Sequence, residues 1–194
     1  AIILQSSQND MHGGQSFAYF DRDMAPYVND ASEEETFQAM EALIYNLNSM
    51  HSRAGAQVPF SSLNLGVETD ENARKITRNV LLAYEKGLGH GENPIFPNII
   101  FRVKEGINFN PEDPNYDLFK LSMRVSAKRL FPNYSFLDAP YNLKYYKQDD
   151  FRTEGDEKFD LSISGIDSNE FENLVFDRVK DGVEGSNKVT TEIK

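Results

Sequence analysis

The sequence contains no cysteine and no tryptophan, and only three of its 194 residues are histidines. Without cysteine the chain has no disulfide, no thiolate metal ligand and no thiol nucleophile or thiyl radical of its own. The three histidines, His12, His51 and His90, are far apart in sequence, which argues against a histidine-rich metal site. A large part of enzyme chemistry is therefore excluded from these residues.

Long apolar runs and a positive charge balance are also missing. No run approaches the roughly 20 residues of a membrane-spanning helix, and residues 1–4 lack the basic flank of a secretory signal. The net charge of −11 argues against a basic face for nucleic acid. With 39% hydrophobic residues the composition is typical of a globular domain, so we expect a cytoplasmic protein that binds neither nucleic acid nor membrane.

Hydrophobic periodicity predicts helices that alternate with short strands. The spacing of apolar residues predicts helices over 30–50, 70–86 and 114–130, and the end of a helix over 2–11. Strand-like runs occupy 57–65, 98–104 and 134–137, where Pro59 indicates an edge position or an irregular start. Strands separated by helices of this length predict an α/β sheet or barrel with crossover helices.

The composition changes after Arg152, and residues 155–194 are rich in acidic side chains. We therefore predict two parts, a domain over 1–154 and a separate acidic tail over 155–194.

A glycine pair follows the first predicted helix, in the run HGGQS from His12 to Ser16. Two glycines let backbone N–H groups converge on an anionic group. The turn at the end of a helix explains the pair equally simply, and on the residues alone it is the favoured interpretation.

The run from His51 to Asn64 joins a helix to a strand. Arg53 has the side chain to clamp a phosphate, whereas the alternative is an arginine that caps helix carbonyls. Ser62 and Asn64 lie two positions apart and therefore point to one face of the strand, where they are candidate ligand-binding residues.

Two further patterns have simple structural interpretations. The glycine-rich loop 87–94 suits close approach to a ligand, but it is equally a plain connection. The carboxylate pairs Asp21 with Asp23 and Asp149 with Asp150 are neighbours in sequence, and we expect them to be solvated charges.

In order along the chain, these signals resemble one family, the anaerobic glycyl-radical (class III) ribonucleoside-triphosphate reductases. The runs that carry the resemblance are HGGQSFAYFDRDMAPYV (12–28), HSRAGAQVPFSSLNLG (51–66), GLGHGENPIFPNIIFRVKEGIN (87–108), DPNYDLF (113–119) and AKRLFPNYSFLDAP (127–140). The resemblance covers residues 1 to about 154.

The resemblance implies part of the first half of a ten-stranded α/β barrel. It implies an enzyme that reduces ribonucleoside triphosphates to deoxyribonucleoside triphosphates for DNA synthesis, with formate as reductant. It also implies a glycyl radical made by a radical-SAM activase, a zinc site near the C-terminal end of the enzyme, and a homodimer that binds allosteric nucleotides.

The chain departs from the family where the chemistry should begin. In the family a radical-bearing cysteine follows a Thr-Glu pair like Thr153-Glu154, whereas here Gly155 follows and no cysteine appears. No catalytic residue and no metal ligand of the family is therefore carried over. We expect a catalytically incomplete piece that works with the remainder of a reductase.

Nucleotide-binding residues remain as candidates. The family places effector nucleotides beside the helix that precedes the glycine pair, which makes Gln8, His12 and Gln15 candidates for effector binding. Substrate binds inside the barrel, which makes Arg53, Ser62 and Asn64 candidates for substrate binding. The alternative function is a non-catalytic nucleotide-binding or regulatory module derived from the enzyme.

Overall fold

A computed structural model describes residues 1–10, 13–50 and 58–143. The elements are α1 (Ile2–Asp10), β1 (Gln15–Phe17), α2 (Phe20–Met24), the 3-10 helix η1 (Ala25–Val28), α3 (Glu33–Ser49), β2 (Ser61–Leu65), α4 (Glu71–Lys86), β3 (Asn98–Val103), α5 (Tyr116–Lys128), β4 (Asn133–Phe136) and α6 (Pro140–Leu143). The chain divides into two units, residues 1–138 and 139–194. Of the second unit, only its first residue, Ala139, and the short helix α6 are described.

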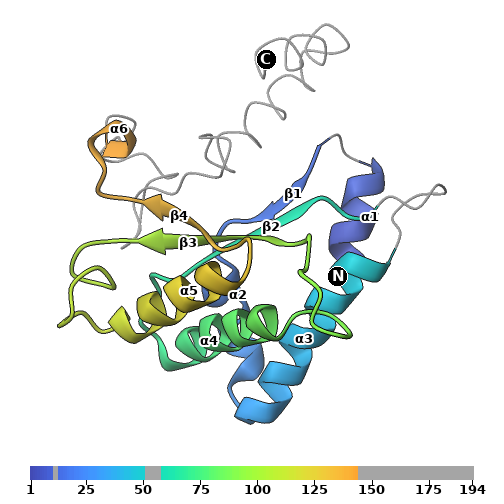
Figure 1. The fold of residues 1–194 in the computed structure, drawn as a ribbon, viewed down its shortest axis with the longest axis horizontal. Coiled ribbons are helices and arrows are strands. Elements are labelled where there is room, and N and C mark those ends of the chain that lie inside the picture. The colour runs from blue at the N-terminus through green and yellow to red at the C-terminus, as the bar shows by residue number, and fades with distance from the viewer. Residues whose placement is uncertain (11–12, 51–57, 144–194) are drawn as a thin grey trace, which may run out of the picture. The chain divides into compact units, whose positions relative to one another are not determined.

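The first unit is a four-stranded parallel sheet in the order β1-β2-β3-β4. Helices connect each strand to the next, and α3, α4 and α5 lie together on one face of the sheet (Figure 1). Parallel neighbours need such crossover connections, because the chain must return to the same end of the sheet. The predicted α/β class is confirmed.

Local sequence signals mark the start of α3 and both ends of α4. Ser32 and Glu35 form a capping box at the start of α3, with the Ser32 hydroxyl accepting from the Glu35 N–H and the Glu35 carboxylate accepting from the Ser32 N–H. Asp70 accepts two backbone N–H groups at the start of α4. Gly87 ends α4 with a φ of 81°, which glycine adopts without steric cost.

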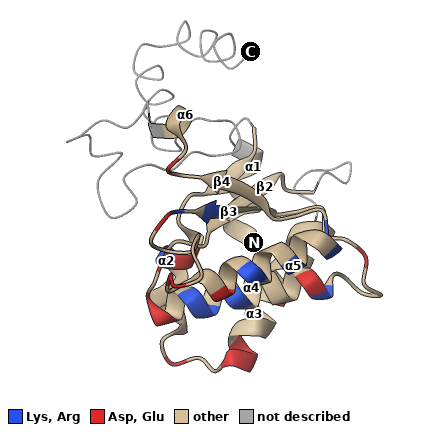
Figure 2. Cartoon of the chain, turned by 60° about the vertical axis from the view of Figure 1, so that its left-hand side comes forward, with Lys and Arg blue, Asp and Glu red and all other residues tan. Residues whose placement is uncertain are grey.

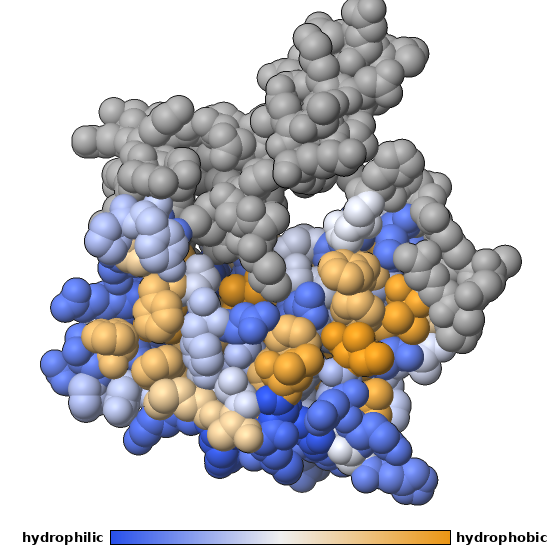
Figure 3. Space-filling view, turned by 45° about the horizontal axis from the view of Figure 1, so that its top comes forward, coloured by the Kyte–Doolittle hydropathy of each residue, from blue (hydrophilic) through white to orange (hydrophobic). Residues whose placement is uncertain are grey.

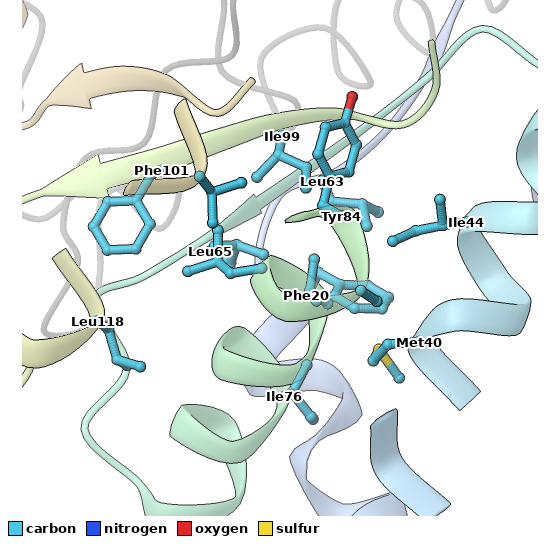
Figure 4. Packing of buried hydrophobic residues seen from close by; sticks show 14 of the residues in the cluster. Phe20, Met40, Ile44, Leu63, Leu65, Ile76, Tyr84, Ile99, Phe101 and Leu118 are labelled. Atoms are coloured by element: carbon cyan, nitrogen blue, oxygen red, sulfur yellow. The ribbon is translucent and has the colours of Figure 1, made fainter. Parts of the chain in front are cut away.

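The main core lies between the sheet and its helices. Leu63 and Leu65 of β2 pair in register with Ile99 and Phe101 of β3, and all four are buried on the helix side. Side chains of α2, α3, α4 and α5 pack against them (Figure 4), namely Phe20, Met40, Ile44, Ile76, Tyr84 and Leu118. Burial of this apolar surface is the main source of stability for the unit.

Some details differ from expectation, and the short helices α2, η1 and α6 were not predicted. The strand β1 was not predicted, because three residues are too few to show an alternating pattern. The second strand, β2, is internal and not at an edge, and it begins two residues after Pro59. Of the two alternatives that Pro59 indicated, an edge position or an irregular start of the strand, the structure agrees with the irregular start. Among the described residues, no helix combines the length and apolarity needed to cross a membrane.

Candidate functional site

The sheet face opposite α3, α4 and α5, here called the open face, carries polar side chains in register. Because Leu63 and Leu65 point to the helices, Ser62 and Asn64 point to the open face, as the alternation predicted. The pairing register places Ser16 of β1 and Asn98 of β3 beside Ser62. Three hydrogen-bonding side chains from three strands therefore form one row.

The open face is also almost free of charge. The only charged residue in the four strands is Arg102 of β3, and the other charges lie on helices and loops (Figure 2). The side of the molecule that faces the viewer in Figure 3 alternates between polar residues and apolar patches. Among the described strand residues, the open face therefore offers neutral hydrogen-bonding groups and one buried cation that is paired with Asp21.

The row is accessible, whereas the second predicted strand residue is not. Ser16 is exposed and Ser62 and Asn98 are half-buried, and none of the three side chains has a hydrogen-bond partner within the described parts of the chain. Asn64 is only 1% exposed. Of the two predicted substrate-binding residues in β2, only Ser62 is therefore open to a ligand in this structure.

At the carboxyl end of the sheet, a buried ion pair joins α2 to β3. Arg102 Nη2 lies 3.4 Å from Asp21 Oδ1, and both side chains are 0% exposed. The other Asp21 oxygen accepts from the Gly66 N–H at 2.7 Å and from the Thr77 hydroxyl at 3.2 Å. The interpretation of Asp21 as a solvated charge was wrong, because its carboxylate links α2, β2, β3 and α4 in the core.

Tyr19 lies beside the same ion pair. Its ring centroid is 4.8 Å from the Arg102 guanidinium carbon and 3.9 Å from that of Arg22. The Arg22 side chain is about half exposed and pairs with Asp23 at 3.3 Å. The aromatic face thus stabilises one buried and one surface cation.

Two asparagines fix the turn that follows β2. Asn108 and Asn115 each donate a side-chain hydrogen bond to the Gly66 carbonyl, at 3.0 and 3.1 Å. Asn115 also donates to the Glu68 carbonyl and accepts from Arg74. Both asparagines are fully buried, so the network positions the backbone at the strand ends and its two amide groups are not available to a ligand.

Two of the three predicted effector residues, Gln8 and Gln15, contact Phe60 just before β2. Gln8 is buried, and its Oε1 accepts from the Phe60 N–H at 2.8 Å. Gln15 donates its backbone N–H to the Phe60 carbonyl at 2.9 Å, and its side chain is half-buried. The structure thus brings Gln8 and Gln15 to one strand end, where Gln8 has a structural contact. His12 and Arg53 lie outside the described residues.

The glycine-rich loop 87–94 is fixed by contacts to the neighbouring helices. Arg129 donates to the carbonyls of Glu85, Lys86 and Gly91 and to the Asn93 side chain. The buried Tyr84 hydroxyl donates to the Pro94 carbonyl, and burial raises the pKa of this phenol while the nearby Arg129 charge opposes the rise. These contacts favour the plain connection over a ligand-binding loop.

The described part of the chain contains no group of three His, Asp or Glu side chains placed to hold a metal ion. Sequence reasoning had missed Ser16, Asn98 and Arg102. Nothing in the local sequence marks them, because their positions in the site follow from strand register.

Comparison with known sequences decides the family. The sequence model of the family described as anaerobic ribonucleoside-triphosphate reductase matches residues 1–191. The chain belongs to this family. Its parallel sheet with crossover helices agrees with a part of the α/β barrel that the resemblance implies.

Individual reductases support the same assignment. The anaerobic ribonucleoside-triphosphate reductase of phage T4 is 33% identical over 157 residues, which cover 69% of this chain and 26% of the relative. Those of Haemophilus influenzae and Escherichia coli are 35% and 31% identical over 112 residues, covering 57% of this chain and 16% of each relative. The chain thus spans about a quarter or less of these reductases. The boundary at residue 154 stays a prediction.

Proposed function

We propose that the chain supplies part of the barrel wall of an anaerobic ribonucleoside-triphosphate reductase and presents its open face to the substrate. The observation that carries this proposal is the row of Ser16, Ser62 and Asn98 on a parallel sheet of this family. Ser62 is the proposed substrate contact, because it is accessible. Arg53, which lies outside the described residues, and the buried Asn64 stay candidates from the sequence. The overall reaction is the reduction of a ribonucleoside triphosphate.

The thiols and the metal ligands of that reaction must come from residues outside this 194-residue sequence. A zinc site needs four ligands, most often cysteine and histidine. This chain has no cysteine, and its described residues gather no group of candidate ligands, so the zinc site implied by the resemblance does not fit here. We assign no chemical step to the glycyl radical, zinc or formate on these residues.

The proposed partners are the remainder of the reductase, a second copy of the enzyme, and the activase that makes the radical. The test is to express this chain together with the segments encoded on either side of it in its native DNA. Conversion of CTP to dCTP is then measured under anaerobic conditions with formate and the activase.

We expect activity that depends on the presence of this chain. A matched preparation without the chain is the control. Only the preparation that contains the chain should convert CTP to dCTP above the detection limit of the assay. If the neighbouring DNA encodes neither cysteine-containing barrel strands nor a radical-glycine segment, the proposal is wrong.

A second proposal is a regulatory module that binds nucleotides without catalysis. It is supported by the turn at Gly13, whose φ is 85°, and by Gln8 and Gln15, which both contact the Phe60 backbone. Equilibrium dialysis with each deoxynucleoside triphosphate tests it. Binding that weakens in Gln15→Ala supports it, and no binding at millimolar concentration rejects it.

A further inference from the structure

The outer face of α5 carries a row of three cations, here called the cationic row. Lys120, Arg124 and Lys128 follow one another at intervals of four residues, which places them on one line along the helix. All three side chains are exposed. The helix has a single acidic residue, Asp117, whose charge is offset by two arginines of α4 that pair with it. The row is therefore a positive surface.

The cationic row contrasts with the acidic remainder of the protein. Helix α4 packs against both α5 and α3, and α3 contains four glutamates without a lysine or an arginine. Figure 2 shows blue segments on α5 and red segments on α3. The whole chain has a net charge of −11, so it repels a long polyanion such as nucleic acid. The row is suited instead to a short acidic segment that contacts it alone.

Contacts with neighbouring side chains hold two of the three cations in place. Arg124 donates two hydrogen bonds to the Glu85 carboxylate of α4, at 3.1 and 2.8 Å, yet its side chain stays 60% exposed. The Lys120 ammonium lies 5.2 Å from the centre of the Tyr116 ring. Lys128 has no ion pair within the described parts of the chain. A row that is partly fixed loses less side-chain freedom when a partner binds.

Exposed apolar side chains accompany the row. Met123 is 42% exposed and follows Lys120 by three positions, so the two are neighbours on the helix surface. Leu130 is 72% exposed and lies two positions after the last residue of α5. Methionine and arginine are both enriched where proteins bind one another. The face thus offers cations together with apolar contact area.

We propose that the outer face of α5 is a docking surface for an acidic amphipathic helix of a partner protein. Four residues advance about 6 Å along a helix, so carboxylates with the same spacing on a second helix face the three cations in turn. Apolar residues beside those carboxylates cover Met123 and Leu130. The contact is small and largely electrostatic, so it is weak and reversible.

This docking surface is independent of the open face. Helix α5 lies on the other face of the sheet (Figure 1), so a partner bound there leaves the row of Ser16, Ser62 and Asn98 uncovered. The proposal therefore adds an interaction to the proposed function and does not rely on it.

A synthetic peptide is the probe. It is a helix of about four turns with glutamate at every fourth position and leucine in the adjacent row, and it carries a fluorescent label. Binding to the 194-residue chain is measured by fluorescence anisotropy. We expect saturable binding with a Kd of about 0.1 mM or below at low salt, weakened about three- to tenfold at roughly 0.3 M salt. No binding at about 1 mM peptide overturns the proposal.

Alanine variants locate the contact. Lys120→Ala and Lys128→Ala should each weaken binding about two- to fivefold, because each removes one exposed ion pair with the peptide. The matched control is Lys86→Ala, which makes the same change in charge on α4, where the side chain pairs with Glu41 of α3. Circular dichroism checks that each variant is folded. An equal loss in Lys86→Ala overturns the assignment to α5.

A charge exchange distinguishes a direct contact from a general effect of charge. Lys120→Glu should weaken binding of the peptide about tenfold or more, since a repulsive pair replaces an attractive one. A second peptide, in which one glutamate is replaced by lysine, should bind Lys120→Glu more tightly than it binds the unchanged chain. If no position of that lysine along the peptide restores binding, the proposal is wrong.

Two further probes have defined outcomes. A peptide of the same composition in scrambled order should bind at least about threefold more weakly, because its carboxylates no longer share one face. Equal binding of the scrambled peptide, or tighter binding of a DNA oligonucleotide of equal charge, overturns the proposal. Reductase activity with the neighbouring segments does not depend on any of these results, so the proposed function and the docking surface fail separately.

Discussion

Asp21 and Arg102 form an ion pair in which neither side chain is exposed, although 81 positions separate them in sequence. A buried pair of this kind contributes little net stability relative to apolar residues, but loss of one partner leaves an uncompensated charge. Since Asp21 also binds Gly66 and Thr77, its carboxylate fixes the carboxyl ends of two strands against α4. Because Asp21 contacts both β3 and the end of β2, it helps to hold these two strands in register. That register places the residues of the open face side by side.

Replacement of Asp21 by alanine should destabilise the chain strongly. We expect a loss of about 3–5 kcal/mol in the free energy of unfolding, because the Arg102 charge stays buried without its partner. Urea unfolding followed by circular dichroism measures it. Asp23→Ala is the control, since Asp23 forms an exposed pair with Arg22 and should cost under about 1 kcal/mol. Equal losses in the two variants would contradict the role of Asp21.

Replacement of Gly87 by alanine should cost more than the same change at Gly91. Both glycines have positive φ, at 81° and 94°, so both variants suffer backbone strain of about 1–3 kcal/mol. Only at Gly87 would the new Cβ lie 2.6 Å from the Glu92 carbonyl oxygen and 2.6 Å from Arg129 Nη2. Thermal unfolding compares the variants, and a Gly91 variant as unstable as the Gly87 variant would show that close packing at Arg129 is unimportant.

The capping box should make the start of α3 sensitive to acid. Hydrogen bonds from the Ser32 backbone and side chain hold the pKa of Glu35 below its ordinary value. A lowered pKa in the folded state means that the stabilisation is present above the ordinary carboxyl pKa and is lost as pH falls through the lowered one. NMR titration of the Glu35 carboxyl should give a lower pKa than in Ser32→Ala, which removes the hydroxyl and keeps the backbone N–H, and equal values would show that the Ser32 hydroxyl does not contribute.

Local signals were sufficient to predict most of the helices and strands. The Ser32–Glu35 box, the Asp70 cap and the Gly87 stop are readable because each depends on residues within one turn of the helix. Alternation likewise predicted that Ser62 and Asn64 share a face. The pairing of Asp21 with Arg102 and of Ser62 with Asn98 was not predictable, because it depends on strand order and register between distant segments.

The two predicted strand residues should respond differently to substitution, although they share a face. Asn64 is 1% exposed, so Asn64→Ala removes a buried amide and should lower the free energy of unfolding by about 1–3 kcal/mol. Ser62 is half-buried and has no hydrogen-bond partner among the described residues, so Ser62→Ala should change stability by under about 0.5 kcal/mol.

The same two variants then separate a structural residue from a binding residue. Stability is measured by urea unfolding, and binding of the substrate CTP is measured on whatever fraction of each variant remains folded. Ser62→Ala should lose binding and keep stability, because its hydroxyl is free to contact a ligand. If Ser62→Ala instead loses stability while Asn64→Ala keeps it, the accessible part of the open face lies at the Asn64 position, and the substrate contact must be reassigned to that residue.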